Sequence, residues 1–112
     1  MKGCLALVLG ACLWGGVITA RAQPAVDVGA AEALTKKSGC MKCHSVSAKK
    51  DGPSFKETAA KYKGKADAEQ KLYTHLTTNP KVKIDGNEEL HESLKTKNDA
   101  EIKNMIQYIL SR

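Results

Sequence analysis

Aromatic residues and cysteines are scarce in this chain of 112 residues, which has one tryptophan, one phenylalanine, three tyrosines and four cysteines. The tryptophan and two of the cysteines fall within the first 22 residues. The remaining pair, Cys40 and Cys43, lies too close together to build a disulfide framework. Because a domain this small has a marginal core of its own, we expect a bound group to fill it.

Residues 1–22 have the composition of an export signal. A positive start precedes an almost wholly apolar stretch, 4–19, and a small-x-small pattern follows it. The stretch is shorter than the roughly 20 residues that span a bilayer, and a lipoprotein signal ending at Cys12 would have too short an apolar region. We predict cleavage before Gln23, which leaves 23–112 as one periplasmic domain without a membrane anchor.

The charge of this domain is mildly positive. Sixteen basic residues and 12 acidic residues give a net charge of +4 without the signal. The lysines are spread along the chain without a basic arm or interleaved aromatic residues, so we expect no nucleic-acid partner. Such a surface suits acidic proteins or anionic membrane surfaces.

Helical spacing and capping residues predict an all-α fold with three or four helices and long loops. We expect no regular structure over 81–97, apart from a turn at 85–87. In the last helix, Ile102, Met105 and Ile109 belong to one apolar stripe, which assigns Met105 to the core. The predicted helices are about 29–38 capped by Asp27, about 55–62 capped by Ser54, a third that Asp67 caps and that runs to about 77, and about 99–110 capped by Asn98 or Asp99.

The chemistry is concentrated at Cys40-Met41-Lys42-Cys43-His44. Two thiols separated by two residues can each add across one vinyl group of a haem. The histidine that follows the second cysteine is then placed to bind the iron, which makes this spacing a signature of covalent haem attachment. We therefore predict one haem c, bound through Cys40 and Cys43 and ligated by His44.

Two other interpretations of the cysteine pair are open. A redox dithiol would use the same spacing, although no predicted strand precedes Cys40. Half of a zinc site is the second, but beyond the motif only His75 and His91 are left to complete it.

The sequence resembles the small bacterial class I cytochromes c of the c5/c551 type. This resemblance implies a small helical fold wrapped around one covalently attached haem. It also implies that the carbonyl of Pro53 accepts a hydrogen bond from the second ring nitrogen of His44. Four features in this order carry it: a helix ending at Gly39, the attachment motif, Gly52-Pro53-Ser54-Phe55, and a last helix ending in Ile106-Gln107-Tyr108-Ile109-Leu110.

The sequence departs from that family on the other face of the haem. Such cytochromes supply a methionine from the loop before the last helix, but the methionines here are Met1, Met41 and Met105. By the resemblance, the ligand position falls close to His91. We predict His91 as the second axial ligand, with His75, Asn87 or a lysine as alternatives, and otherwise a solvated loop histidine. Imidazole in place of thioether would lower the reduction potential.

These features favour a monomeric electron carrier that exchanges single electrons with acidic or membrane-bound redox proteins. No catalytic constellation accompanies the attachment motif, and we expect no enzymatic activity. The alternative is a sensor or binder of NO, CO or O2 whose distal ligand can be displaced.

Overall fold

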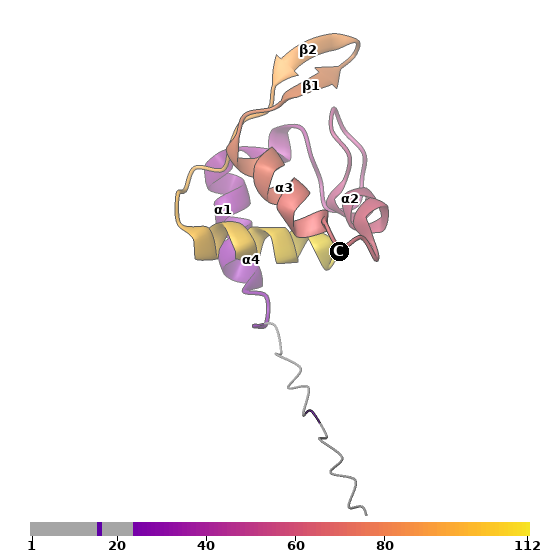
Figure 1. Ribbon diagram of the computed structural model, residues 1–112. Helices are drawn as coiled ribbons and strands as arrows, with labels where there is room; N and C mark the ends of the chain where they lie inside the picture. Colours follow the sequence, from indigo (N-terminus) through magenta and orange to yellow (C-terminus); the bar gives the residue numbers. More distant parts are fainter. Residues whose placement is uncertain (1–15, 17–23) are drawn as a thin grey trace, which may run out of the picture.

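The computed structural model describes Gly16 and residues 24–112. The predicted signal and its cleavage point lie outside the described residues, Gly16 excepted. Four α-helices dominate this described part of the chain, and Figure 1 shows their order. The elements are α1 (Val28–Ser38), the 3₁₀ turn η1 (Cys40–Lys42), α2 (Phe55–Tyr62), α3 (Ala68–Thr77), β1 (Lys81–Ile84), β2 (Asn87–Leu90) and α4 (Asp99–Leu110).

The second helix has the predicted bounds and the first begins one residue earlier than predicted, at Val28. Local signals explain both. The Asp27 carboxylate accepts a hydrogen bond from the Ala30 amide at 2.9 Å, and Gly39 ends α1 with a φ of 71°. Ser54 and Glu57 form a reciprocal capping box at the start of α2, with bonds of 3.1 and 2.7 Å. Gly39 therefore turns the chain directly from α1 into the cysteine motif.

The start of α3 differs from the prediction. Asp67 occupies the N-cap position, but its side chain makes no capping hydrogen bond. Its carboxylate pairs instead with Lys71 one turn later, at 2.7 Å. Asn98 caps α4 through hydrogen bonds from the amides of Ala100 and Glu101.

The last helix, α4, is the centre of the fold and packs against α1, α2 and α3. In Figure 1 it runs across the base of the molecule, beneath α3. Met105 is only 1% exposed, which confirms its assignment to the core. The buried apolar side chains of α4 are Ile102, Met105, Ile106, Tyr108 and Ile109.

The prediction of a loop over 81–97 was wrong for its first half, which forms a β-hairpin. Strands β1 and β2 pair antiparallel, with Lys81 opposite Leu90. Asp85 and Gly86 connect them with φ angles of 49° and 84°, as a two-residue hairpin turn requires. The pattern Lys-Val-Lys-Ile alternates with period two, so a search for helical period alone overlooks it. Figure 1 shows the hairpin projecting from the end of α3 that faces away from α4.

Candidate haem site

His44 is held in place by residues close to it in the sequence. Its Nδ1 lies 2.7 Å from the carbonyl oxygen of Pro53, the contact expected from the resemblance. The amide of Gly52 donates to the carbonyl of Cys43 at 2.8 Å, which draws the two ends of the loop together. With Nδ1 occupied, the other ring nitrogen of His44 is free to bind a metal.

The two cysteines are free thiols and half-buried. Burial raises the pKa of the Cys40 thiol above its ordinary value. Reactive dithiols need a lowered pKa, because the thiolate is the nucleophile. The surroundings of Cys40 therefore favour the haem interpretation of the motif over the redox dithiol.

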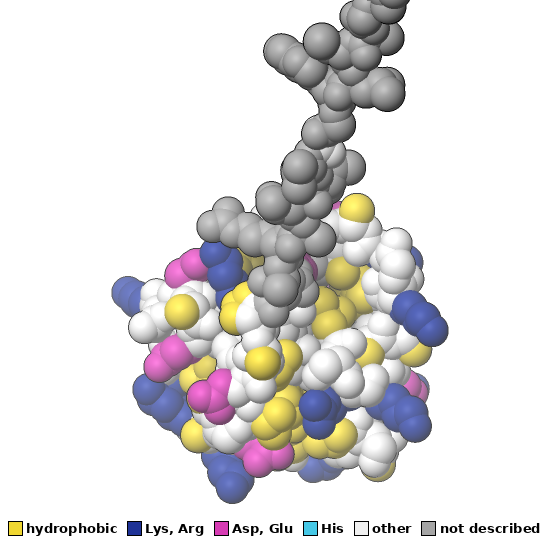
Figure 2. Space-filling view, turned by 90° about the horizontal axis from the view of Figure 1, so that it is seen from below, with side chains coloured by type: hydrophobic (Ala, Val, Ile, Leu, Met, Phe, Trp, Pro, Cys, Tyr) yellow, Lys and Arg dark blue, Asp and Glu magenta, His cyan; other side chains and the backbone are white. Residues whose placement is uncertain are grey.

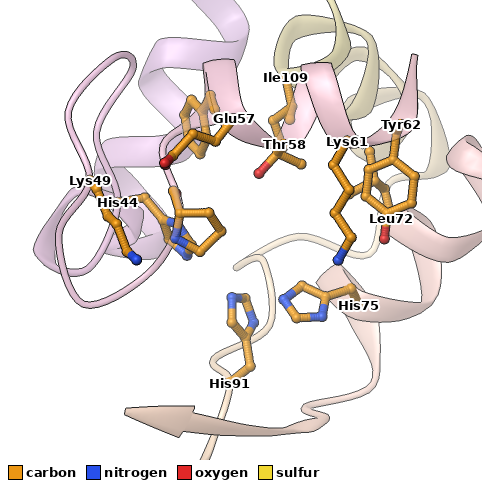
Figure 3. Close-up of a pocket in the computed structure, with 12 residues that line it drawn as sticks. His44, Lys49, Glu57, Thr58, Lys61, Tyr62, Leu72, His75, His91 and Ile109 are labelled. Atoms are coloured by element: carbon orange, nitrogen blue, oxygen red, sulfur yellow. The ribbon is translucent and has the colours of Figure 1, made fainter. Parts of the chain in front are cut away.

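His91 lies immediately after β2 and faces His44 from the opposite side of a cavity (Figure 3). The centroids of the two rings are 5.9 Å apart, and the rings are tilted by 56°. The Nδ1 atom of His91 is buried and has no hydrogen-bond partner in the described part of the chain. An unpaired buried nitrogen is costly, so a group that completes this site is expected.

His75, on α3, lies beside His91 with a ring-centroid separation of 4.2 Å. The His75 side chain is half-buried and lines the cavity, so it is not fully exposed on the surface of α3. Burial is the main cause that lowers the pKa of His75 to about 4, and the neighbouring His91 lowers it further. Burial also lowers the pKa of His91, followed by the effect of His44. Both rings are thus neutral near pH 7, the form that binds metals.

Two cavities of about 330 and 240 Å³ meet at the histidines. Four side chains line both cavities: His44, Phe55, His75 and His91. The smaller cavity is also lined by Cys40 and Cys43, and the larger by Lys49 and Lys61. Figure 3 shows the Lys61 side chain extending toward His75 in the larger cavity.

This lining matches the chemistry of a haem. Its two vinyl groups would meet the cysteines of the smaller cavity. Lysines that could pair with its two carboxylates line both cavities, Lys49 and Lys61 the larger and Lys42 and Lys83 the smaller. Both cavities together have the size of a cofactor site, roughly 300–1,000 Å³. Leu90 lines the smaller cavity and is 68% exposed in the protein alone, an apolar surface that a haem would cover.

Comparison with known proteins agrees with this geometry. The profile of the family "Cytochrome c" matches residues 28–112. The chain therefore belongs to the cytochrome c family, and its fold is that of the small class I members. As in that family, one haem c is attached covalently through Cys40 and Cys43.

Two solved structures and one curated relative illustrate the similarity. The class 1 cytochrome MtoD from Sideroxydans lithotrophicus ES-1 is 50% identical with a TM-score of 0.74, covering 78% of this chain and 97% of that one. Cytochrome c552 from Nitrosomonas europaea is 30% identical with a TM-score of 0.56, covering 71% and 96%. Cytochrome c-551 of Allochromatium vinosum is 54% identical over 39 residues, which are 35% of this chain and 42% of that protein. The chain thus spans about two fifths of the curated relatives it matches.

The structure brings together every predicted site residue: Cys40, Cys43, His44, Pro53 and His91. Sequence reasoning did not find the lysines at the larger cavity. It also did not predict that the Asn79 side chain is hydrogen-bonded to the His91 loop. The Asn-Pro pair at 79–80 was the available signal, but a partner 12 residues away cannot be read from it.

Proposed function

We propose that this chain is an exported single-electron carrier in which His44 and His91 bind the haem iron from opposite sides. The facing pair of imidazole rings at 5.9 Å carries the proposal. Covalent haem supplies the redox-active iron. The residues around the iron determine whether it transfers electrons or binds small ligands.

The separation of the rings suits a shared metal ion. A metal–nitrogen bond of histidine is about 2 Å long, and the ring centroid lies roughly 1 Å behind the nitrogen, so two opposed imidazoles need centroids about 6 Å apart. The distance from His44 to His91 agrees with this requirement. The half-buried position of His91 and its lowered pKa, which keeps the ring neutral, favour the same role.

Two firmly held imidazoles favour electron transfer over ligand capture. Pro53 fixes the His44 ring, and the peptide of His91 is hydrogen-bonded on both sides. Iron with both axial positions filled changes its charge with little rearrangement and leaves no site for a substrate. Imidazole is a stronger donor than thioether, so we expect a potential below that of relatives with methionine.

Substitution of His91 tests the proposal. His91→Ala should convert the oxidised protein from low-spin to high-spin in absorption and EPR spectra, because one strong axial donor is lost. His75→Ala is the matched control, since it removes the adjacent imidazole and should leave the iron low-spin. A low-spin spectrum retained in His91→Ala would refute the ligand assignment, and its loss in His75→Ala would assign the ligand to His75.

Carbon monoxide distinguishes the carrier from a sensor of small ligands. Reduced wild-type protein should show no prompt spectral shift with CO, whereas His91→Ala should bind CO at once. A prompt shift in the wild type would favour the sensor, because a displaceable distal ligand is what that function requires.

The charge distribution supports an acidic redox partner. Over residues 49–65 there are six lysines and two acidic residues, a net +4 that equals the net charge of the whole of 23–112. All six lysines are exposed, and the segment adjoins the larger cavity through Lys49 and Lys61. The face seen in Figure 2 carries acidic, basic and apolar side chains together.

The ionic-strength dependence of a reaction with an anionic oxidant tests this surface. Hexacyanoferrate(III) should oxidise the reduced protein faster at low salt, and Lys63→Glu should weaken that dependence. Lys36→Glu on α1 makes the same charge change outside the segment and serves as the control. Equal effects of the two variants would contradict a localised docking surface.

Export and a monomeric state complete the proposal. Within the described residues, no helix has the length and hydropathy needed to cross a bilayer. Mass spectrometry of the protein from its native host should find a haem-bearing chain that begins at Gln23, and size exclusion should give a monomer. Retention of residues 1–22 in the haem-bearing chain would contradict cleavage.

A further inference from the structure

Asn79 adopts an unusual backbone conformation between α3 and the hairpin. Its φ is 50°, in the left-handed region that side-chain-bearing residues rarely enter. Pro80 follows, and a residue before proline is normally extended. Asparagine tolerates the left-handed region better than most residues, but a conformation held against two preferences needs compensating contacts.

Those contacts reach the loop that carries His91. The Asn79 Nδ2 donates a hydrogen bond to the carbonyl of His91 at 3.0 Å, and its Oδ1 accepts one from the hydroxyl of Ser93 at 2.9 Å. The amide of His91 donates to the carbonyl of Pro80 at 2.8 Å. Both peptide groups of His91 are therefore bonded to residues 79–80, across the base of the hairpin.

We propose that Asn79 is a positioning residue for the distal iron ligand. Its carboxamide joins the end of α3 to the His91 loop. These bonds keep His91 directed at the iron even when the hairpin between residues 80 and 91 moves. The inference rests on the proposed role of His91. It predicts that loss of the Asn79 donor speeds the departure of His91 from the iron.

The contacts allow the two bonds of Asn79 to be separated. Asn79→Asp keeps an acceptor for Ser93 and a side chain that tolerates positive φ, but it cannot donate to His91. Ser93→Ala removes only the other bond. Asn79→Gly adopts the same backbone without strain and removes both. Thr78→Ala is the control, since its hydroxyl bonds only to Thr74 within the end of α3.

Cyanide binding to the oxidised holoprotein reports how fast His91 leaves. At saturating cyanide the observed rate is limited by His91 dissociation. Asn79→Asp and Asn79→Gly should raise this limiting rate by roughly 2- to 10-fold, the effect of one net hydrogen bond. Ser93→Ala should change it less than either, and Thr78→Ala should leave it at the wild-type value.

The ligand assignment of His91 and the positioning role of Asn79 are contradicted by different results. If His91→Ala is high-spin but both Asn79 variants exchange at the wild-type rate, Asn79 has no positioning role and the ligand assignment stands. If His91→Ala stays low-spin, the ligand assignment and the inference fall together. A lower unfolding temperature in the Asn79 variants without faster exchange would mean that Asn79 only ends the helix.

Discussion

Replacing Gly52 by alanine should displace the ring of His44, which we propose as an iron ligand. A Cβ at position 52 would lie 2.5 Å from Cε1 and 2.8 Å from Nδ1 of His44. Ordinary van der Waals contact begins near 3.4 Å, so the ring or the loop must move by about 1 Å. The loop resists, because the Gly52 amide is bonded to the Cys43 carbonyl at 2.8 Å.

The cost has two parts. Overpacking of this kind costs about 1–3 kcal/mol, and displacing His44 from the Pro53 carbonyl loses a hydrogen bond worth about 0.5–1.5 kcal/mol. A total of about 1.5–4.5 kcal/mol lowers the unfolding midpoint of a domain this size by roughly 6 °C or more. The lost bond also makes His44 a weaker donor, so the reduction potential should rise.

Thermal unfolding of the oxidised holoprotein, followed by circular dichroism and the Soret band, measures the first effect, and a redox titration the second. Gly29→Ala is the matched control, because its Cβ would meet only an Asp27 oxygen at 3.7 Å and alanine favours the helix. It should leave both quantities nearly unchanged or raise the midpoint slightly. A Gly52→Ala protein with wild-type midpoint and potential would refute the argument from close approach.

Three further predictions concern the frame around the site. Met105→Ala should cost about 2–5 kcal/mol in urea unfolding, because Met105 is fully buried, and should leave the haem spectrum unchanged. Asn104→Ala should cost roughly 1–3 kcal/mol, measured in the same way, since Asn104 makes two bonds of 2.8 Å to the backbone of Asp27. Hydrogen bonds from Ser54 lower the pKa of Glu57, so the stability that its carboxylate contributes is present above its ordinary pKa and is lost as the pH falls through the lowered value. Glu57→Gln should therefore flatten the acid side of the stability profile, and a profile of unchanged shape would contradict this role.

The helices could be predicted because their signals are local. Asp27, Gly39 and Ser54 act within four residues of themselves, and the apolar stripe of α4 repeats within one element. The haem attachment was predictable for the same reason, since five consecutive residues carry it. Asp67 shows the limit of such signals, because Lys71 competes for its carboxylate and takes the place of the amide.

The hairpin and the contacts of Asn79 could not be predicted in this way. Lys81 pairs with Leu90 in a register that depends on both strands and on the turn between them, so neither strand alone predicts it. The bonds from Asn79 reach residues 12 and 14 positions away, and no property of the Asn-Pro pair specifies them. Lys49 and Lys61 reach the larger cavity because the loop before α2 and α2 itself carry them there. Nothing in the sequence distinguishes these two lysines from the lysines elsewhere on the surface.

The two sides of the haem therefore differ in how the chain specifies them. The proximal side is complete within residues 40–53, where the cysteines, His44 and its Pro53 partner follow one another. The distal side that we propose, with His91, forms only when residues 76–80 meet residues 91–94, through bonds at Leu76, Asn79 and Pro80. His91 itself lies outside the four packed helices of the described residues and outside the buried core, so the residue at this position can change while the core of α4 stays the same. The attachment motif identifies the family, and the backbone contacts at the base of the hairpin position the residue that we propose as the second iron ligand.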